Sequence, residues 1–163
     1  MNKIIYFIIA VIWLVADQWT KWLSVLELKD KHQIINVLPV LNWEYAENHG
    51  AAFSFLATQG GWQKWFFLAI GVVAVVVLTI GIIKAHKGQF FLLFGYASIL
   101  GGAIGNVYDR AVFGYVRDMI SVYYEPIGFK FAIFNVADVA ISVGVGALII
   151  DWLLSMRKEK QGG

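Results

Sequence analysis

The chain has no cysteine and little charge. Its 163 residues include 13 Lys or Arg and 11 Asp or Glu, so 15% are charged, against roughly 25% in ordinary soluble domains. Without cysteine, disulfides, thiolate nucleophiles and cysteine-ligated metals are excluded. Hydrophobic residues make up 60% of the chain, which indicates a membrane protein. The net charge of +2 comes from residues at segment ends, which is typical of topology signals rather than of nucleic-acid binding.

Four apolar segments predict one integral membrane domain over 1–163, a membrane α-helical bundle. The segments lie at about 4–22, 62–83, 90–108 and 133–154. Each is close to the ~20 residues that cross a bilayer core of about 30 Å. The first segment lacks the small-residue cleavage pattern of a signal peptide, so we expect an uncleaved anchor. Loops at 24–61 and 109–131 leave no room for a separate soluble catalytic domain.

Lysine and arginine are equally numerous on the two sides of the predicted membrane. On the side of the termini they lie within much shorter stretches of chain, and this density favours termini in the cytoplasm and the two long loops outside. Four tryptophans then form an aromatic belt at the outer interface: Trp19, Trp22, Trp62 and Trp65.

The first long loop contains a strand pattern. Residues 41–46 alternate apolar and polar side chains, as a half-buried strand does. The run at 51–56 could return as a second strand or lie on the membrane surface. We therefore expect a small extracytoplasmic β-sheet at the interface.

Asp138 stands inside an apolar run that is long enough to span the bilayer. An ionisable group there costs on the order of 2.5–3.5 kcal/mol, so it is a functional-site hypothesis. Asn135 and Ser142 share its helix face. The alternative is a polar helix-packing seam. Gly101 and Gly105 are spaced for close helix packing, and we give them no other role.

A second polar group ends the third segment. Asn106, Asp109 and Arg110 lie at its outer end, and Arg110 could hold Asp109 or Asp118 by paired hydrogen bonds. An inconsequential surface ion pair is the alternative for Asp109. Asp118 follows in a second outer loop rich in β-branched and aromatic residues, where a solvated position is equally compatible with the sequence.

Asp118 and Asp138 predict aspartic-protease chemistry if they meet. Two carboxylates at one site cannot both ionise cheaply, so they share a proton. The ionised acid then takes a proton from an attacking water, while the protonated acid donates to the scissile carbonyl oxygen.

Asp17 and Lys21 are four residues apart near the outer end of the first helix. We expect an internal ion pair with the Lys21 ammonium extending outward. The functional alternative is a serine–lysine dyad with Ser24. The three histidines are isolated, without the paired spacing of a metal site.

Five motifs together resemble the bacterial lipoprotein signal peptidase (type II signal peptidase) family. They are Asp-Gln-Trp-Thr-Lys at 17–21, Asn-His-Gly-Ala-Ala-Phe-Ser-Phe at 48–55, Gly-Gly-Ala-Ile-Gly-Asn-Val-Tyr-Asp-Arg at 101–110, Val-Arg-Asp at 116–118 and Phe-Asn-Val-Ala-Asp at 134–138. The family cleaves signal peptides from diacylglyceryl-modified prolipoproteins just before the lipidated cysteine, without metal or cofactor. The resemblance therefore implies an aspartic endopeptidase of the bacterial inner membrane.

By matching motif, Asp118 and Asp138 resemble the family's catalytic pair. The supporting or substrate-binding positions implied by the resemblance are Asp17, Lys21, Asn48, Asn106, Arg110 and Asn135. Family members often have valine where this chain has Arg117. That arginine could lower the pKa of Asp118 or point to solvent.

The resemblance also implies a substrate-cradling sheet near 41–56, a movable flap at 109–131, contact with membrane lipids, and inhibition by the cyclic peptide globomycin.

The main rival to this function is a proton-coupled transporter or channel subunit with a relay through Asp17, Lys21 and Asp138. A relay would need ionisable residues through the inner halves of the helices. These halves are almost purely apolar, apart from Asp151 near the cytoplasmic edge. A purely structural four-helix protein would leave the clustering of Asn and Asp at one depth unexplained.

Overall fold

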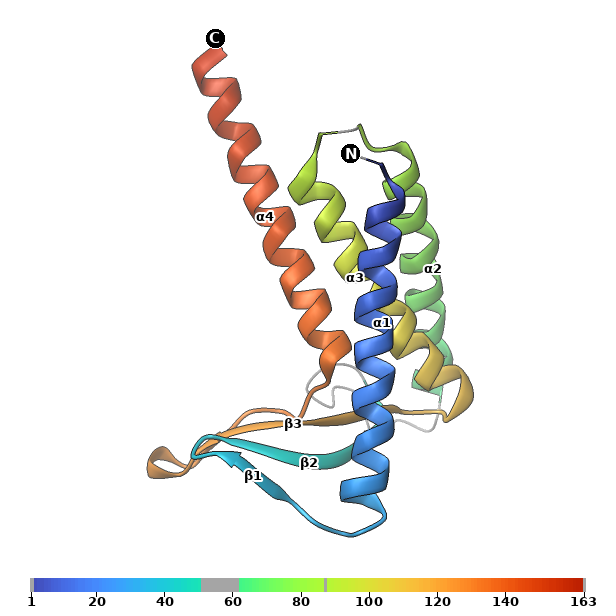
Figure 1. Ribbon diagram of the computed structural model, residues 1–163, viewed down its shortest axis with the longest axis vertical. Coiled ribbons are helices and arrows are strands. Elements are labelled where there is room, and N and C mark those ends of the chain that lie inside the picture. The colour runs from blue at the N-terminus through green and yellow to red at the C-terminus, as the bar shows by residue number, and fades with distance from the viewer. Residues whose placement is uncertain (1, 51–61, 87, 163) are drawn as a thin grey trace.

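The computed structural model describes residues 2–50, 62–86 and 88–162. Within these residues, four helices are long and apolar enough to cross a membrane, which confirms the predicted class of fold. They are α1 (Ile4–Ser24), α2 (Trp62–Lys84), α3 (Phe90–Val112) and α4 (Val136–Gly162). A small antiparallel sheet lies at one end of the bundle, and both termini lie toward the other end (Figure 1).

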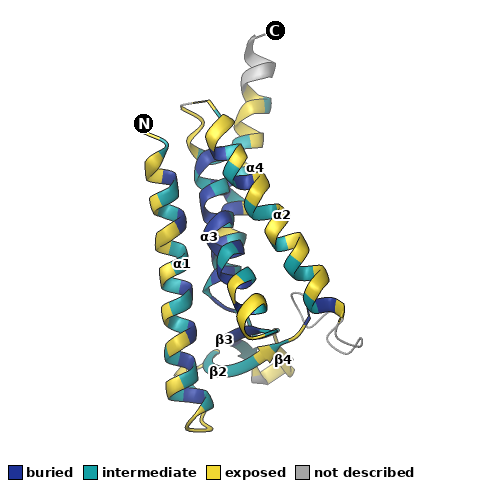
Figure 2. Ribbon diagram, turned by 90° about the vertical axis from the view of Figure 1, so that its right-hand side faces the viewer, coloured by how far each residue is buried: buried dark blue, intermediate teal, exposed yellow. Residues whose placement is uncertain are grey.

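α3 forms the centre of the bundle. It packs on α4, α2 and α1, and it is the most buried of the four helices (Figure 2). α2 instead exposes apolar side chains along most of its length, as a helix facing lipid does. The core near the termini joins Tyr6 and Ala10 of α1, Leu78 and Ile82 of α2, and Leu93, Ala97 and Leu100 of α3.

Small residues let the helix backbones approach closely. A Cβ placed on Gly101 would lie 2.5 Å from the Ala10 carbonyl oxygen of α1, and one on Gly105 would collide with the Asp17 side chain. The packing role expected for this glycine pair is confirmed. On α4, a Cβ on Gly144 would lie 2.7 Å from the carbonyl oxygen of Gly95 on α3.

The sheet has the strand order β1-β2-β3-β4. Its strands are β1 (Ile35–Leu38), β2 (Leu41–Asn48), β3 (Val116–Tyr124) and β4 (Phe129–Lys130). The strand predicted at 41–46 is confirmed as part of β2, whereas the run at 51–56 lies outside the described residues.

The second outer loop contains a central strand. β3 pairs with β2 on one side and with β4 on the other, so Asp118 lies in a paired strand and not in a solvated loop. The β-branched and aromatic residues of this stretch suit a pleated surface. Val116 and Met119 are buried in the core, which fixes the strand against the bundle.

Three helix boundaries differ from the expected ones. Each difference changes whether nearby polar residues lie in a helix, in a helical turn or at a helix cap. α3 continues to Val112 instead of ending near 108. α1 is followed by a π-helical turn, Val25–Lys29, where a loop was expected. α4 begins at Val136 rather than 133, because Asn135 caps its first turn. The polar ends of α1, α3 and α4 therefore meet beside the sheet.

Gly144→Ala tests the close contact of α3 and α4. The new Cβ would lie 2.5 Å from Ile99 Cγ1 and 2.7 Å from Gly95 O, so we expect the free energy of unfolding to fall by about 1–3 kcal/mol. Gly146→Ala is the matched control, because a Cβ there meets nothing within 4 Å. Thermal unfolding in detergent should separate the two variants, and equal melting temperatures would contradict this packing.

Candidate active site

Asn135 and Asp138 form a reciprocal cap at the start of α4. The Asn135 side-chain oxygen accepts a hydrogen bond from the Asp138 backbone N–H (3.0 Å), and Asp138 Oδ2 accepts one from the Asn135 N–H (3.2 Å). Such a capping box satisfies backbone donors that the first helical turn leaves unpaired. The Asp138 carboxylate is thereby fixed in the first turn of α4, at the positive end of the helix dipole.

Asp118 lies on β3 and is only 2% exposed. Its Oδ1 accepts a hydrogen bond from Asn135 Nδ2 (2.6 Å), and its Oδ2 accepts one from Asn48 Nδ2 (3.0 Å). Burial raises the pKa of Asp118 to about 7, and the negative charge of Asp138 acts in the same direction. The side chain of Asn135 therefore binds one acid while its backbone and amide oxygen hold the other.

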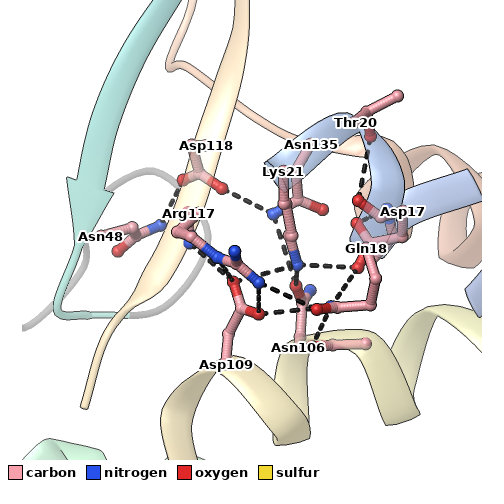
Figure 3. A network of polar contacts seen from close by, with 12 residues as sticks. Asp17, Gln18, Thr20, Lys21, Asn48, Asn106, Asp109, Arg117, Asp118 and Asn135 are labelled. Atoms are coloured by element: carbon pink, nitrogen blue, oxygen red, sulfur yellow. Dashed lines mark hydrogen bonds and ion pairs between the residues drawn. The ribbon is translucent and has the colours of Figure 1, made fainter. Parts of the chain in front are cut away.

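Asn106 of α3 links this pair to α1. Its Nδ2 donates to Asp138 Oδ1 (3.0 Å), while its Oδ1 accepts from Lys21 Nζ (3.0 Å) and from Asn135 Nδ2 (3.3 Å). Both ends of the Asn106 amide are therefore engaged, and its orientation is set by the ammonium of Lys21 (Figure 3).

Lys21 is the centre of a buried ion network. Its side chain is fully buried, and its Nζ lies 2.9 Å from Asp17 Oδ2 and 3.3 Å from Asp109 Oδ2. The ion pair with Asp17 was expected, but the outward extension of Lys21 was wrong. The Lys21 ammonium contacts two carboxylates, and the Ser24 hydroxyl donates to the Lys21 carbonyl instead of to its amine. The serine–lysine alternative is therefore not supported.

Arg117 supplies the second cation of the network. Its Nη2 and Nε lie 2.8 and 3.1 Å from the two carboxylate oxygens of Asp109, and Nη2 also donates to Gln18 Oε1 at 2.8 Å. Asp109 is fully buried, so its interpretation as an inconsequential surface pair was wrong.

Of the two interpretations of Arg117 from the sequence, the one that points it to solvent was wrong. The residue is 7% exposed, and its guanidinium binds Asp109 on the other side of the turn. Successive strand residues point to opposite faces, so Arg117 turns away from its neighbour. The signal that sequence reasoning missed is charge balance. Asp17 and Asp109 are two buried acids beside one lysine, so they require a second cation.

Arg110 does not hold Asp109 or Asp118. Its Nη2 donates to the Gly50 carbonyl (3.1 Å), and its guanidinium lies 5.5 Å from the ring centre of Phe67 on α2. Consecutive helical residues differ in direction by about 100°. Asp109 consequently faces α1 and β3, while Arg110 faces a cleft.

That cleft has a volume of about 650 Å³ and a mostly apolar lining from α2, α3, α4 and the segment before α4. Its polar lining residues are Asn48, Asn106, Arg110, Asp138 and Ser142. Asp138 is partly exposed here, whereas Asp118 is buried behind it. This exposure argues against a simple helix-packing seam for Asp138. Among the described residues, no group of three His or acidic side chains could hold a metal ion.

Asp17→Asn tests the buried network. The change leaves Lys21 without one of its two carboxylates, and breaking a buried pair lowers stability by about 3–5 kcal/mol. The matched control is Glu27→Gln, because Glu27 also pairs with a lysine four residues on, but at an exposed position, where a pair contributes less than about 1 kcal/mol. Thermal unfolding in detergent measures both, and equal effects would contradict the central role of the network.

Comparisons with known proteins identify the family. The family described as signal peptidase (SPase) II matches residues 9–154. A lipoprotein signal peptidase of Alteromonas mediterranea is 44% identical over 147 residues, which cover 90% of this chain and 79% of that protein. One from Acinetobacter baumannii is 41% identical over 150 residues, covering 92% and 84%.

A solved structure of a bacterial membrane enzyme has the same fold. It superposes with a TM-score of 0.79 at 30% identity and covers 93% of this chain and 88% of its own. The sequence and structure matches agree over nearly the whole chain. They confirm the resemblance carried by the five motifs, and the chain belongs to the signal peptidase II family of membrane peptidases.

Proposed function

We propose that Asp118 and Asp138 are the catalytic pair of an aspartic endopeptidase that cleaves diacylglyceryl-modified prolipoproteins before the lipidated cysteine. The observation that carries this proposal is the bridge formed by Asn135, which binds Asp118 through its side chain and Asp138 through a reciprocal cap. The relatives named lipoprotein signal peptidase support the substrate class.

The different environments of the two acids support different roles. Asp118 is buried and its pKa is raised to about 7, so it is the acid that keeps a proton near neutral pH. Asp138 borders the cleft at the positive end of the α4 dipole and accepts a hydrogen bond from Asn106 there. Asp138 then takes a proton from the attacking water, and Asp118 gives its proton to the carbonyl oxygen. As the tetrahedral intermediate collapses and the C–N bond breaks, Asp138 gives its proton to the leaving amine, and the Asp118 carboxylate takes back the proton of one hydroxyl group, which restores the starting state of both acids.

The cleft is suited to an apolar substrate. Membrane-spanning helices supply most of its walls, including Phe67 and Ile70 of α2 and Val139 of α4, so a signal peptide and acyl chains can remain at membrane depth. Arg110 borders the same space with its guanidinium fixed by Gly50 and Phe67. We assign it to binding a substrate carbonyl or the ester-linked lipid. A globomycin-type cyclic peptide would compete for this cleft.

We further place the protein in the bacterial inner membrane with both termini in the cytoplasm. The density of lysine and arginine near the termini supports this orientation, and the sheet lies at the opposite end of the bundle (Figure 1). The site then faces the outer leaflet, where an exported prolipoprotein arrives. Trp19, Trp22, Trp62 and Trp65 are exposed, as residues of an interfacial belt are.

The transporter alternative has no support from the comparisons, which name peptidases. The polar residues gather beside the sheet, and the inner halves of the four apolar segments contain no Asp, Glu, Lys, Arg or His other than Asp151. A proton relay would need ionisable groups across the full depth.

Asp118→Asn and Asp138→Asn test the proposal. Each removes one member of the acid pair, so we expect turnover to fall by at least about 1,000-fold, in line with the loss of a catalytic acid or base. The measurement is cleavage of a diacylglyceryl-modified prolipoprotein by the purified protein in detergent.

The controls are Asp151→Asn, which alters a carboxylate 13 residues beyond Asp138 on α4, and the same substrate without its lipid. Asp151→Asn should cleave normally, and the unmodified substrate should remain intact. Normal turnover by either dyad variant would overturn the catalytic assignment, while equal cleavage of both substrates would overturn the lipid specificity.

A further inference from the structure

Arg117 connects three elements through one buried side chain. From β3, its guanidinium reaches both carboxylate oxygens of Asp109 on α3 and the side-chain oxygen of Gln18 on α1. Its own backbone N–H also donates to Asp109 Oδ2 (3.0 Å). The Phe113 ring completes the pocket at 4.4 Å from the guanidinium.

These contacts close the turn that leads into the site. α3 ends at Val112 and β3 begins at Val116, with Gly114 between them at a φ of 89°. Asp109 lies before this turn and Arg117 after it, and the hydrogen bonds between them hold the two ends of the turn together. Since Asp118 is the next residue of β3, any shift of Arg117 along the strand moves the Asp118 carboxylate relative to α4.

Arg117 also balances the buried charges. The cations that pair with Asp109 are Lys21 from α1 and Arg117 from β3, and Lys21 is shared with Asp17. Two anions and two cations therefore make a neutral network. Without the Arg117 charge this network would carry a net negative charge, and the guanidinium of Arg110, which interacts with Asp109, Asp118 and Asp138, would be unchanged.

We propose that Arg117 is a positioning residue for the peptidase reaction, because its bidentate contact with Asp109 sets the place of Asp118 on β3. This inference rests on the proposed function of Asp118 and Asp138. It assigns a role to a residue that touches neither acid through its side chain. It also predicts that geometry matters as well as charge, because only a guanidinium reaches both Asp109 oxygens and Gln18 at once.

The test compares Arg117→Gln and Arg117→Lys with Ile82→Ala. Ile82 is fully buried in the core near the termini, so its truncation lowers stability far from the site. For cleavage of the lipidated prolipoprotein, we expect Arg117→Gln to lower kcat by at least about ten-fold with KM within about two-fold, since small misplacements have effects of this size. Arg117→Lys keeps the charge and should fall between Gln and wild type.

The pH dependence of kcat distinguishes a loss of the Arg117 charge from a general loss of folded protein. In Arg117→Gln the unpaired Asp109 charge opposes ionisation of the acid pair, so the profile of kcat should move to higher pH. Arg117→Lys should keep the wild-type profile. If the Gln variant does not fold, a kcat of Arg117→Lys reduced by at least about two-fold at unchanged melting temperature supports the same proposal.

Three results would overturn the proposal: wild-type kcat in Arg117→Gln, wild-type kcat in Arg117→Lys, or an equal loss of kcat in Ile82→Ala at a matched melting temperature. Asp118→Asn assayed in parallel distinguishes this failure from that of the proposed function. An inactive Asp118→Asn beside a fully active Arg117→Gln removes only the role of Arg117. An active Asp118→Asn removes the catalytic pair itself.

Discussion

The buried ammonium of Lys21 is the constraint on which the site depends. A charge without access to water must be paired, and removing one partner costs several kcal/mol. Lys21 of α1 has its partners on two helices, Asp17 on its own and Asp109 on α3. Asp17 in turn accepts a hydrogen bond from the Ala137 N–H of α4 (2.9 Å). The three helices therefore cannot slide past one another without leaving a buried charge unpaired.

The same ammonium sets the direction of the polar groups around the acids. It binds the oxygen of Asn106, so the Asn106 NH₂ group must face Asp138. Asn135 is fixed by its role as a helix cap, and its NH₂ group faces Asp118. Donors that are oriented before substrate arrives need no reorganisation during the reaction. The ion network supports catalysis by this geometry, although none of its charged residues is placed on the reacting atoms.

Much of the architecture could be predicted from the sequence, because hydropathy and alternation report burial directly. The four spans and the strand at 41–46 follow from these patterns, and Asp138 was conspicuous as an acid in an apolar run. Side-chain direction was harder to predict. Asp109 and Arg110 are adjacent in sequence but face different elements. The pairing of Asp109 with Arg117 depends on β3 entering the sheet beside β2. Spacing along the sequence does not encode this contact between distant strands.

The central claim is that Asp118 and Asp138 form one site that holds a single proton near neutral pH. Isotope-edited infrared titration of the Asp118 carboxyl in the detergent-solubilised protein tests it most directly. We predict a protonated carboxyl band that is lost as pH rises through about 7, and a lower midpoint in Asp138→Asn, where the neighbouring negative charge is gone. A band already absent at pH 5, or a midpoint that does not respond to Asp138→Asn, would contradict it.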